Sequence, residues 1–405
     1  MSRPFGLFSV YGVELEYMLV DCKTLNVAPI ADQLMWREAG QNTGELTRGA
    51  MAWSNELALH LIELKTNGPS QNLESLPALF QAEINHINDI FHGEFQLLPT
   101  AAHPWMEPTK ETKLWPFDND VIYQAYDRIF NCRGHGWSNL QSAHLNLPFA
   151  NDHELMQLHT AIRSLLPIIP ALSASSPFIE KKLTGTMDTR LVYYMANQDI
   201  IPEISGHIIP EYIESEYEYQ QKILQPMYQA VAKHDSDQVL QEEWLNSRGA
   251  IARFDRHAVE IRVLDIQECP LADLAVHAAI VNVLKTIIAE KWLPIQAHKN
   301  LTEQMLKNIF VTMVRDGQMG IITDKAYLQL FGYAGHKATA KELWQYLLAE
   351  SAPLPLLFQE PIHTIFKYGT LAERIVSLQK KLNNLKSVYQ QLANCLKHGA
   401  LFIPS

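Results

Sequence analysis

Residues 12–18 read Gly12-Val13-Glu14-Leu15-Glu16-Tyr17-Met18, a run in which apolar residues alternate with two carboxylates. This period of two is typical of a β-strand that is buried on one face. Glu14 and Glu16 then project side by side from the same face, with no basic residue between them. A divalent cation would remove their repulsion, and Mg²⁺ prefers carboxylate oxygens together with phosphate oxygens and water. Considered alone, this pair fits a solvated strand face better than a metal site.

A second acidic segment spans residues 53–65, and its strand-forming residues predict one strand that ends at Asn67-Gly68-Pro69. It carries Glu56 and Glu63, but a gap of seven residues places them on opposite faces of a regular strand unless a bulge or bend intervenes. The alternative for Glu63 is an ion pair with Lys65 on a surface strand.

Two further strands carry the same kind of pattern. On residues 258–265, Glu260 and Arg262 share one face, and on a shorter strand His144 and Asn146 do the same. Carboxylates on several strands could therefore converge on one sheet face, which would suit Mg²⁺ and a nucleotide. Alone, His144 is more often a structural residue than a ligand.

The remaining patterns predict an α+β protein. Helical spacing of apolar residues recurs through most of the chain, and the C-terminal part is mainly helical. We expect one domain over residues 1–405, with residues 301–405 as its helical C-terminal region. The predicted elements are a strand at 141–147, helices at 73–91, 152–166, 212–233 (with Pro226 as a kink or boundary), 271–292 and 371–396, and a polar loop at 184–190.

Composition excludes several classes of protein. The 405 residues are 47% hydrophobic and 19% charged, which is ordinary for a globular chain. A net charge of -11 gives no field that would attract DNA or RNA. The four cysteines form no CxxC pair, as expected of free thiols in the cytoplasm. The apolar run 274–292 contains Lys285, Glu290 and Lys291, so no membrane span is expected.

Nucleotide-binding motifs of the common kinds are missing from the sequence. Neither a P-loop nor the glycine-rich turn of a Rossmann fold occurs, so a bound ATP would have to be held by metals and arginines on a sheet. Arg190, Arg253 and Arg262 each offer a permanent planar fork for a carboxylate or phosphate, although any one of them could be an ordinary ion-pair partner.

Taken together, these segments resemble glutamate-cysteine ligase family 2, a group of carboxylate-amine ligases related in fold to glutamine synthetase. The matching pieces occur in the family's order over about the first two thirds of the chain. They are Gly12-Val13-Glu14-Leu15-Glu16, Glu56-Leu57, Glu63-Leu64-Lys65-Thr66, His144-Leu145-Asn146, residues 171–178, residues 184–190, residues 259–265 and, more loosely, residues 369–374.

The resemblance implies a curved, mainly antiparallel sheet with helices on its outer face, and with ATP and Mg²⁺ (or Mn²⁺) on the concave face. Arg262 would lie beside the transferred phosphoryl group and act with Glu63 in catalysis. Arg190 and Arg253 would bind the amino-acid substrate, and Asn146 would join His144 and Arg262 at the nucleotide. The metal ligands implied by the resemblance are Glu14, Glu16, Glu56, Glu63, His144 and Glu260.

The family's reaction joins an amino-acid carboxylate, glutamate in the first instance, to an amine through an acyl phosphate. Two places depart from the family pattern: Asn146 stands where a second histidine is frequent, and Arg256-His257 replaces a Gly-Thr pair. Cysteine is therefore the leading amine, with another amine nearly as well supported. The alternatives are a catalytically silent binder of ATP or amino acid, and a metal-dependent kinase for small molecules.

Two features have more than one interpretation. The tryptophans Trp105, Trp115 and Trp137 and the tyrosines between 212 and 219 could line a substrate pocket, but aromatic clusters more often belong to the core. The apolar helix face at 276–288 would serve a core or a homodimer interface equally well. A homodimer is therefore one possible assembly.

Overall fold

The computed structural model describes residues 4–404 of the chain. Within that range one sheet contains eight strands in the order β2-β3-β4-β1-β6-β10-β9, and β5 pairs with the last residues of β1. Every neighbouring pair in this sheet is antiparallel. The strands are β1 (Gly12–Asp21), β2 (Glu45–Arg48), β3 (Met51–Asn55), β4 (Leu61–Thr66), β5 (Phe95–Leu98), β6 (Ser142–Pro148), β9 (Ala250–Arg253) and β10 (Ala258–Asp265).

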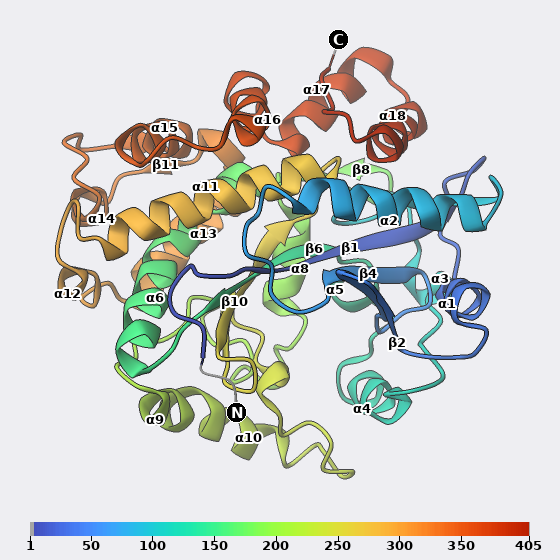
Figure 1. Cartoon of the computed structure of the whole chain (residues 1–405), viewed down its shortest axis with the longest axis horizontal. Helices are drawn as coiled ribbons and strands as arrows, with labels where there is room; N and C mark the ends of the chain where they lie inside the picture. Colours follow the sequence, from blue (N-terminus) through green and yellow to red (C-terminus); the bar gives the residue numbers. More distant parts are fainter. Residues whose placement is uncertain (1–3, 405) are drawn as a thin grey trace.

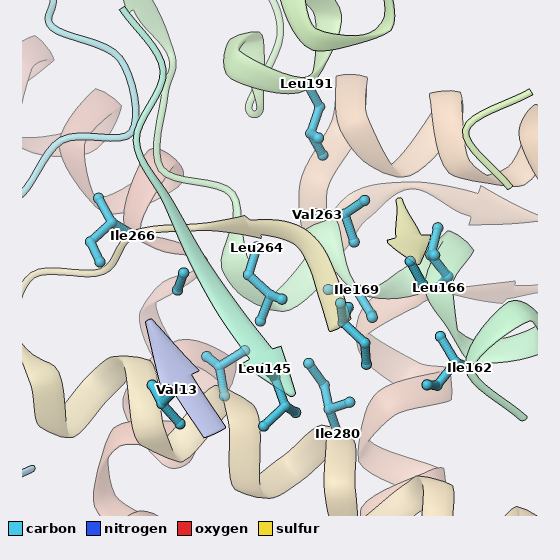
Figure 2. Packing of buried hydrophobic residues seen from close by; sticks show 14 of the residues in the cluster. Val13, Leu145, Ile162, Leu166, Ile169, Leu191, Val263, Leu264, Ile266 and Ile280 are labelled. Carbon is cyan, nitrogen blue, oxygen red and sulfur yellow. The ribbon is translucent and has the colours of Figure 1, made fainter. Parts of the chain in front are cut away.

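Helices α2 (Leu76–Ile90), α6 (Asp152–Leu165) and α11 (Pro270–Ile288) pack on one face of this sheet (Figure 1). Most apolar residues of the alternating strands point toward these helices. Val13 of β1 and Leu145 of β6 are fully buried and lie near Ile280 of α11 (Figure 2). Burial of such side chains contributes roughly 1.5–3 kcal/mol each to folding. On the opposite face, Met18 and Val20 belong to a second apolar cluster with C-terminal residues such as Leu392, and polar residues occupy the rest of that face.

The C-terminal helices form an outer layer against α2, α11 and β5 (Figure 1). Residues 321–322 (β11) and 338–339 (β12) pair as a short ribbon within this region. The predicted helix at 371–396 is two helices, because Asn383 takes a left-handed conformation with φ 49° between them. The helices are α12 (Ile295–His298), α13 (Glu303–Asp316), α14 (Lys325–Leu330), α15 (Ala340–Glu350), α16 (Leu356–Tyr368), α17 (Leu371–Leu382) and α18 (Leu385–His398).

The predicted strand at 53–65 is wrong as a single element. β3 ends at Asn55 and β4 begins at Leu61, and the connection between them is tied to a distant segment by backbone hydrogen bonds. Leu59 N donates to the Lys113 carbonyl oxygen at 2.9 Å, and Trp115 N donates to the Leu57 carbonyl oxygen at 3.0 Å. Glu56 therefore lies on a connection between two strands, and the argument from regular strand spacing does not apply to it.

Two other predicted elements also differ. The polar loop at 184–190 ends before Arg190, which lies in the first turn of α8 (Thr189–Ala196), where the Asp188 side chain caps the helix by accepting from Leu191 N. The helix at 212–233 is shorter, at residues 216–231, and a π-helical turn precedes Pro226. The other elements are α1 (Ala31–Ala39), α3 (Pro108–Glu111), α4 (Asp120–Phe130), α5 (His135–Ser138), α7 (Pro170–Ser173), α9 (Glu216–Tyr219), α10 (Gln225–Val231), β7 (Phe178–Ile179) and β8 (Lys182–Leu183).

By length and composition, α11 is apolar enough to cross a membrane, but 78% of the relevant window is buried inside the protein. Its side chains pack against α2, α6 and α16. The apolar face at 276–288 therefore belongs to the core of this chain.

Candidate active site

Strand register brings the predicted acidic residues together on the polar face of the sheet. In the β1–β4 pair, Glu14 lies opposite Lys65 and Glu16 lies opposite Glu63. In the β1–β6 pair, Glu14 lies opposite His144. Because side chains on one face of a sheet lie close to those directly across the pairing, these five residues form a continuous polar surface. All five border one cavity of about 360 Å³.

Arg262 lies on the same surface because it alternates with Glu260 along β10, and a β-bulge follows it directly. β10 is in regular register with β6 as far as Ile261, and regular pairing resumes at Leu264. Arg262 and Val263 thus lie opposite a single residue of β6. A bulge of this kind changes the direction of the side chains that follow it. Val263 packs in the core (Figure 2), while Arg262 Nε lies 3.1 Å from Glu260 Oε1 and borders the cavity.

Glu14 is held in its ionised form. Its Oε2 lies 2.8 Å from His144 Nδ1, and Arg256 Nη1 lies 3.5 Å from its Oε1. Burial alone would raise the pKa of Glu14, but the hydrogen bond and charge of His144, with Arg256 and Lys65, lower it to about 2. Glu14 is therefore a permanent anion in the cavity.

His144 is held in its charged form by the same neighbours. Burial lowers its pKa, but the hydrogen bond with Glu14 and the charges of Glu16 and Glu260 outweigh burial and raise the pKa to about 9. Its Nε2 lies 2.9 Å from Ser142 Oγ and 3.7 Å from Glu16 Oε1. In this arrangement a proton on the imidazole neutralises part of the negative charge that a metal ion would otherwise neutralise.

Glu63 has two polar neighbours on the strands of the sheet. Ser54 Oγ donates to its Oε1 at 2.6 Å, and Lys65 Nζ lies 3.5 Å from the same oxygen. Burial and the charge of Glu14 raise the pKa of Glu63 to about 7 despite these partners. Glu63 is only 8% exposed, so the pair with Lys65 is not the surface pair of the alternative interpretation.

Glu56 has the least charge compensation of the cavity carboxylates. Burial, followed by the charges of Glu16 and Glu63, raises its pKa well above the usual range. The bend between β3 and β4 brings Glu56 to the cavity despite its unfavourable spacing in the sequence. Among residues 4–404, Glu56 is thus the carboxylate of this cavity that has no ion-pair partner.

The donor atoms of these residues fit divalent cations. Glu63 belongs to two groups of three residues, and in each group one ligand atom per residue lies within 4.8 Å of the others. Carboxylate oxygens predominate, as Mg²⁺ and Mn²⁺ prefer. Glu260 lies outside both groups, because its oxygens face Arg262 and Arg253. The groups are Glu14, Glu63 and His144, and Glu16, Glu56 and Glu63.

The other two predicted arginines also border the cavity. Arg190 is almost completely buried, and its Nε donates to Asp265 Oδ1 at 2.5 Å while its Nη2 lies 3.4 Å from the Arg262 carbonyl oxygen. Arg253 is paired with Asp255 at 3.1 Å. The structure thus brings both residues to the site, with Arg190 in a rigid position.

Asn146 borders an adjoining cavity of about 390 Å³. Its Nδ2 donates to Glu14 Oε1 at 3.3 Å, so it touches the acidic cluster from the second cavity. Glu14, Lys65 and Arg256 line both cavities. The site therefore has an acidic centre with a second compartment beside it.

Sequence reasoning missed several residues that line the main cavity. Lys65 could have been found, because it alternates with Glu63 on one strand face. Trp137, which the sequence left open between a pocket and the core, borders the cavity and also packs against the core, whereas Trp115 and Tyr219 are buried core residues as expected. No local pattern marks the remaining lining residues, which come from helices α4 and α8 and from connections between elements. They include Tyr123, Tyr126, Tyr194, Asn197, Gln198, Trp244 and Arg256.

The family model for glutamate-cysteine ligase family 2 (GCS2) matches residues 10–323, and the chain belongs to this family. An uncharacterized protein of Archaeoglobus fulgidus is 32% identical over 394 residues, which is 97% of this chain and 100% of that protein. A Bradyrhizobium diazoefficiens protein, provisionally named glutamate-cysteine ligase 2, is 24% identical over 53% of this chain and 46% of its own length. This chain thus aligns with about half of that relative.

Solved structures share the fold at low sequence identity. Glutamate-cysteine ligase of Francisella tularensis, in complex with AMP, has a TM-score of 0.62 and 12% identity over 98% of this chain and 90% of that one. A bifunctional glutathione synthetase of Pasteurella multocida has a TM-score of 0.58 and 13% identity over 97% of this chain and 52% of that one. The mixed arrangement of helices and antiparallel sheet is therefore that of glutamate-cysteine ligase, and the chain is a ligase by family.

Proposed function

We propose that this protein is an ATP- and magnesium-dependent ligase that joins the γ-carboxylate of glutamate to an amine through an acyl phosphate. The observation that carries this proposal is the pair of acidic groups that share Glu63 and lie on the same polar surface as Arg262. Membership of the family and the fold it shares with glutamate-cysteine ligase support it. We further propose one catalytic domain that acts in the cytoplasm.

In this proposal each of the two cavities binds a different part of the substrates. The second cavity has apolar walls from Val10, Ala52 and Pro69, and Lys65 and Arg256 stand where it meets the acidic centre. Such a compartment suits a nucleoside whose phosphates extend toward the acidic centre. Divalent cations bound by the six predicted ligands, of which Glu260 is the least supported, would neutralise phosphate charge.

The protein's own residues position the reacting groups. A carboxylate oxygen of the acid attacks the γ-phosphorus and ADP leaves; the amine nitrogen then attacks the acyl carbon, loses a proton, and phosphate leaves with the former carboxylate oxygen. Arg262 offers a planar fork for the transferred phosphoryl group. Arg190, fixed by Asp265, and Arg253 would hold the carboxylate of the amino acid.

Replacement of Glu63 by glutamine is expected to weaken Mn²⁺ binding by at least about tenfold, because one substitution removes an anionic ligand from both groups. Titration of Mn²⁺ into the ATP-free protein, followed by electron paramagnetic resonance of the free ion, measures this directly. Glu45→Gln is the matched control, since Glu45 also pairs with Lys65, at 3.3 Å, but lies outside both groups. Equal Mn²⁺ affinity in Glu63→Gln and the parent would contradict the assignment.

Phosphate release from Mg-ATP separates the three candidate functions. Release that requires both glutamate and an amine, with formation of the amide detected by mass spectrometry, identifies a ligase. Phosphorylation of an acceptor without any need for an amine identifies a small-molecule kinase. Binding of ATP without turnover, across a panel of acids and amines, identifies a silent binder.

A further inference from the structure

One end of the main cavity differs in chemistry from the acidic centre. We call it the aromatic–amide compartment. It borders Arg262, since the Tyr194 hydroxyl lies beside that guanidinium. None of its residues is a carboxylate, whereas all five carboxylates that line the cavity lie outside the compartment. The compartment is lined by Tyr126, Trp137, Tyr194, Asn197, Gln198 and Trp244.

Aromatic rings form its walls. Tyr126 lies with its ring centroid 5.0 Å from that of Trp137 and 6.1 Å from that of Trp244. Trp137 is itself supported by Phe130, with centroids 5.3 Å apart in a stacked arrangement, so its position is fixed by packing. Walls of this kind favour a ligand with a flat or apolar body.

The oxygens of the two amide side chains lack hydrogen-bond partners within residues 4–404. Asn197 Nδ2 donates to the Gly136 carbonyl oxygen at 2.9 Å, which fixes the amide and leaves Oδ1 buried without a hydrogen bond among residues 4–404. Gln198 is 2% exposed, and its Oε1 likewise has no partner within the described chain. Buried polar atoms are normally hydrogen-bonded, so two unpartnered oxygens on neighbouring residues that line the cavity indicate a ligand that donates N–H groups.

We propose, on the basis of the ligase function above, that this compartment selects the amine substrate, and that the amine carries a neutral, planar N–H donor, of which a primary carboxamide is the simplest form. A second ammonium group would lack a carboxylate partner here. The thiol of cysteine is a weak donor that cannot satisfy both acceptors. Acceptors built to hydrogen-bond one group discriminate strongly against analogues that lack it.

The position of the compartment supports the assignment to the amine. Tyr194 and Arg262 place it next to the proposed site of phosphoryl transfer, where the amine nitrogen must reach the acyl carbon. The apolar cavity at the opposite side of the acidic centre, beyond Glu14 and Lys65, is the one with room for the nucleoside. The two compartments thus flank the reacting atoms.

Matched amines and a matched variant test this proposal. Glycinamide and n-propylamine are primary amines of similar size, and the first alone carries a carboxamide; cysteine is the third acceptor. Because the two amine nitrogens differ in basicity, the quantity to compare is the ratio of kcat/KM for glycinamide to kcat/KM for propylamine, and we expect Gln198→Leu to lower this ratio about tenfold relative to the parent. Exposed Gln221 provides the control variant, Gln221→Leu, which should behave as the parent.

Tryptophan fluorescence gives a readout that does not depend on turnover, because Trp137 and Trp244 line the compartment. Glycinamide should alter the emission with a Kd that Gln198→Leu weakens about tenfold. If no amine supports turnover but this binding difference remains, the ligase proposal fails and the compartment assignment stands. The assignment is overturned if cysteine is preferred and Gln198→Leu leaves the acceptor ratio unchanged, if glycinamide does not bind, or if the variant weakens ATP binding instead.

Discussion

The Arg262→Ala variant is expected to lose at least about 10²-fold in kcat/KM for amide formation, because it removes a charged group aimed at the transferred phosphoryl group. Alternation with Glu260 along β10 places this side chain on the cavity surface, and its guanidinium is anchored by Glu260 and by the Asn246 carbonyl oxygen at 3.4 Å. Steady-state phosphate release with glutamate and the best amine measures the loss. Arg262→Lys keeps the charge without the planar fork, so its activity should recover only in part.

Controls separate a catalytic defect from misfolding. Arg128→Ala removes an arginine from a surface ion pair with Asp237, whose side chains are both more than 40% exposed, and should change activity and stability little. Thermal unfolding of each variant shows whether the loss of Arg262 destabilises the protein. Glu260 keeps one cationic partner in the variant, because Arg253 lies 3.6 Å away. Wild-type kcat/KM in a folded Arg262→Ala protein would exclude a role in phosphoryl transfer.

Arg374→Met is expected to lower the free energy of unfolding by about 3–5 kcal/mol, because it leaves a buried carboxylate without its cation. Arg374 and Glu268 are both fully buried and are paired at 2.5 Å. The same guanidinium donates to the carbonyl oxygens of Phe402, at 2.6 Å, and Gly369, at 3.2 Å, so it also fastens the C-terminal segment to α17. Urea unfolding monitored by circular dichroism measures the change.

A double variant distinguishes loss of the ion pair from loss of packing. In Arg374→Met/Glu268→Leu no unpaired charge remains, and part of the stability should return, since apolar replacement of a whole buried pair is often neutral. A single variant within about 1 kcal/mol of the parent would show that this ion pair contributes little. The residues 369–374, which matched the family loosely, thus have a structural explanation.

The elements that could be predicted from the sequence are those whose pattern is local. The strand at 258–265 is observed with the same bounds, and the alternation at 12–18 correctly separated the carboxylate face from the core face. Which strands lie side by side is set by non-local pairing, and spacing within one strand does not contain it. The sequence pattern alone therefore does not predict that Glu14, Glu63 and His144 lie close together. The resemblance to the family implies it, and the strand register shows it.

The failures have physical causes. The segment 53–65 has strand-forming residues throughout, and its bend depends on hydrogen bonds to residues 113 and 115, which no local pattern reveals. A tryptophan such as Trp137 fits a core as well as a pocket. Its place on the cavity wall depends on packing against Tyr126 and Phe130 of α4, which the sequence does not reveal. Asn197 and Gln198, whose amide oxygens are unpartnered, come directly after the end of α8. No hydrophobic periodicity in the sequence marks such positions.

Transfer of oxygen from the acid to phosphate tests the central claim most directly. Glutamate labelled with ¹⁸O in its γ-carboxylate would be incubated with Mg-ATP, the best amine and the protein, and the released phosphate analysed by mass spectrometry. Activation through an acyl phosphate predicts one ¹⁸O atom in each phosphate released, matched by one amide formed. Unlabelled phosphate, or amide formed without labelled phosphate, would contradict the proposed ligase mechanism.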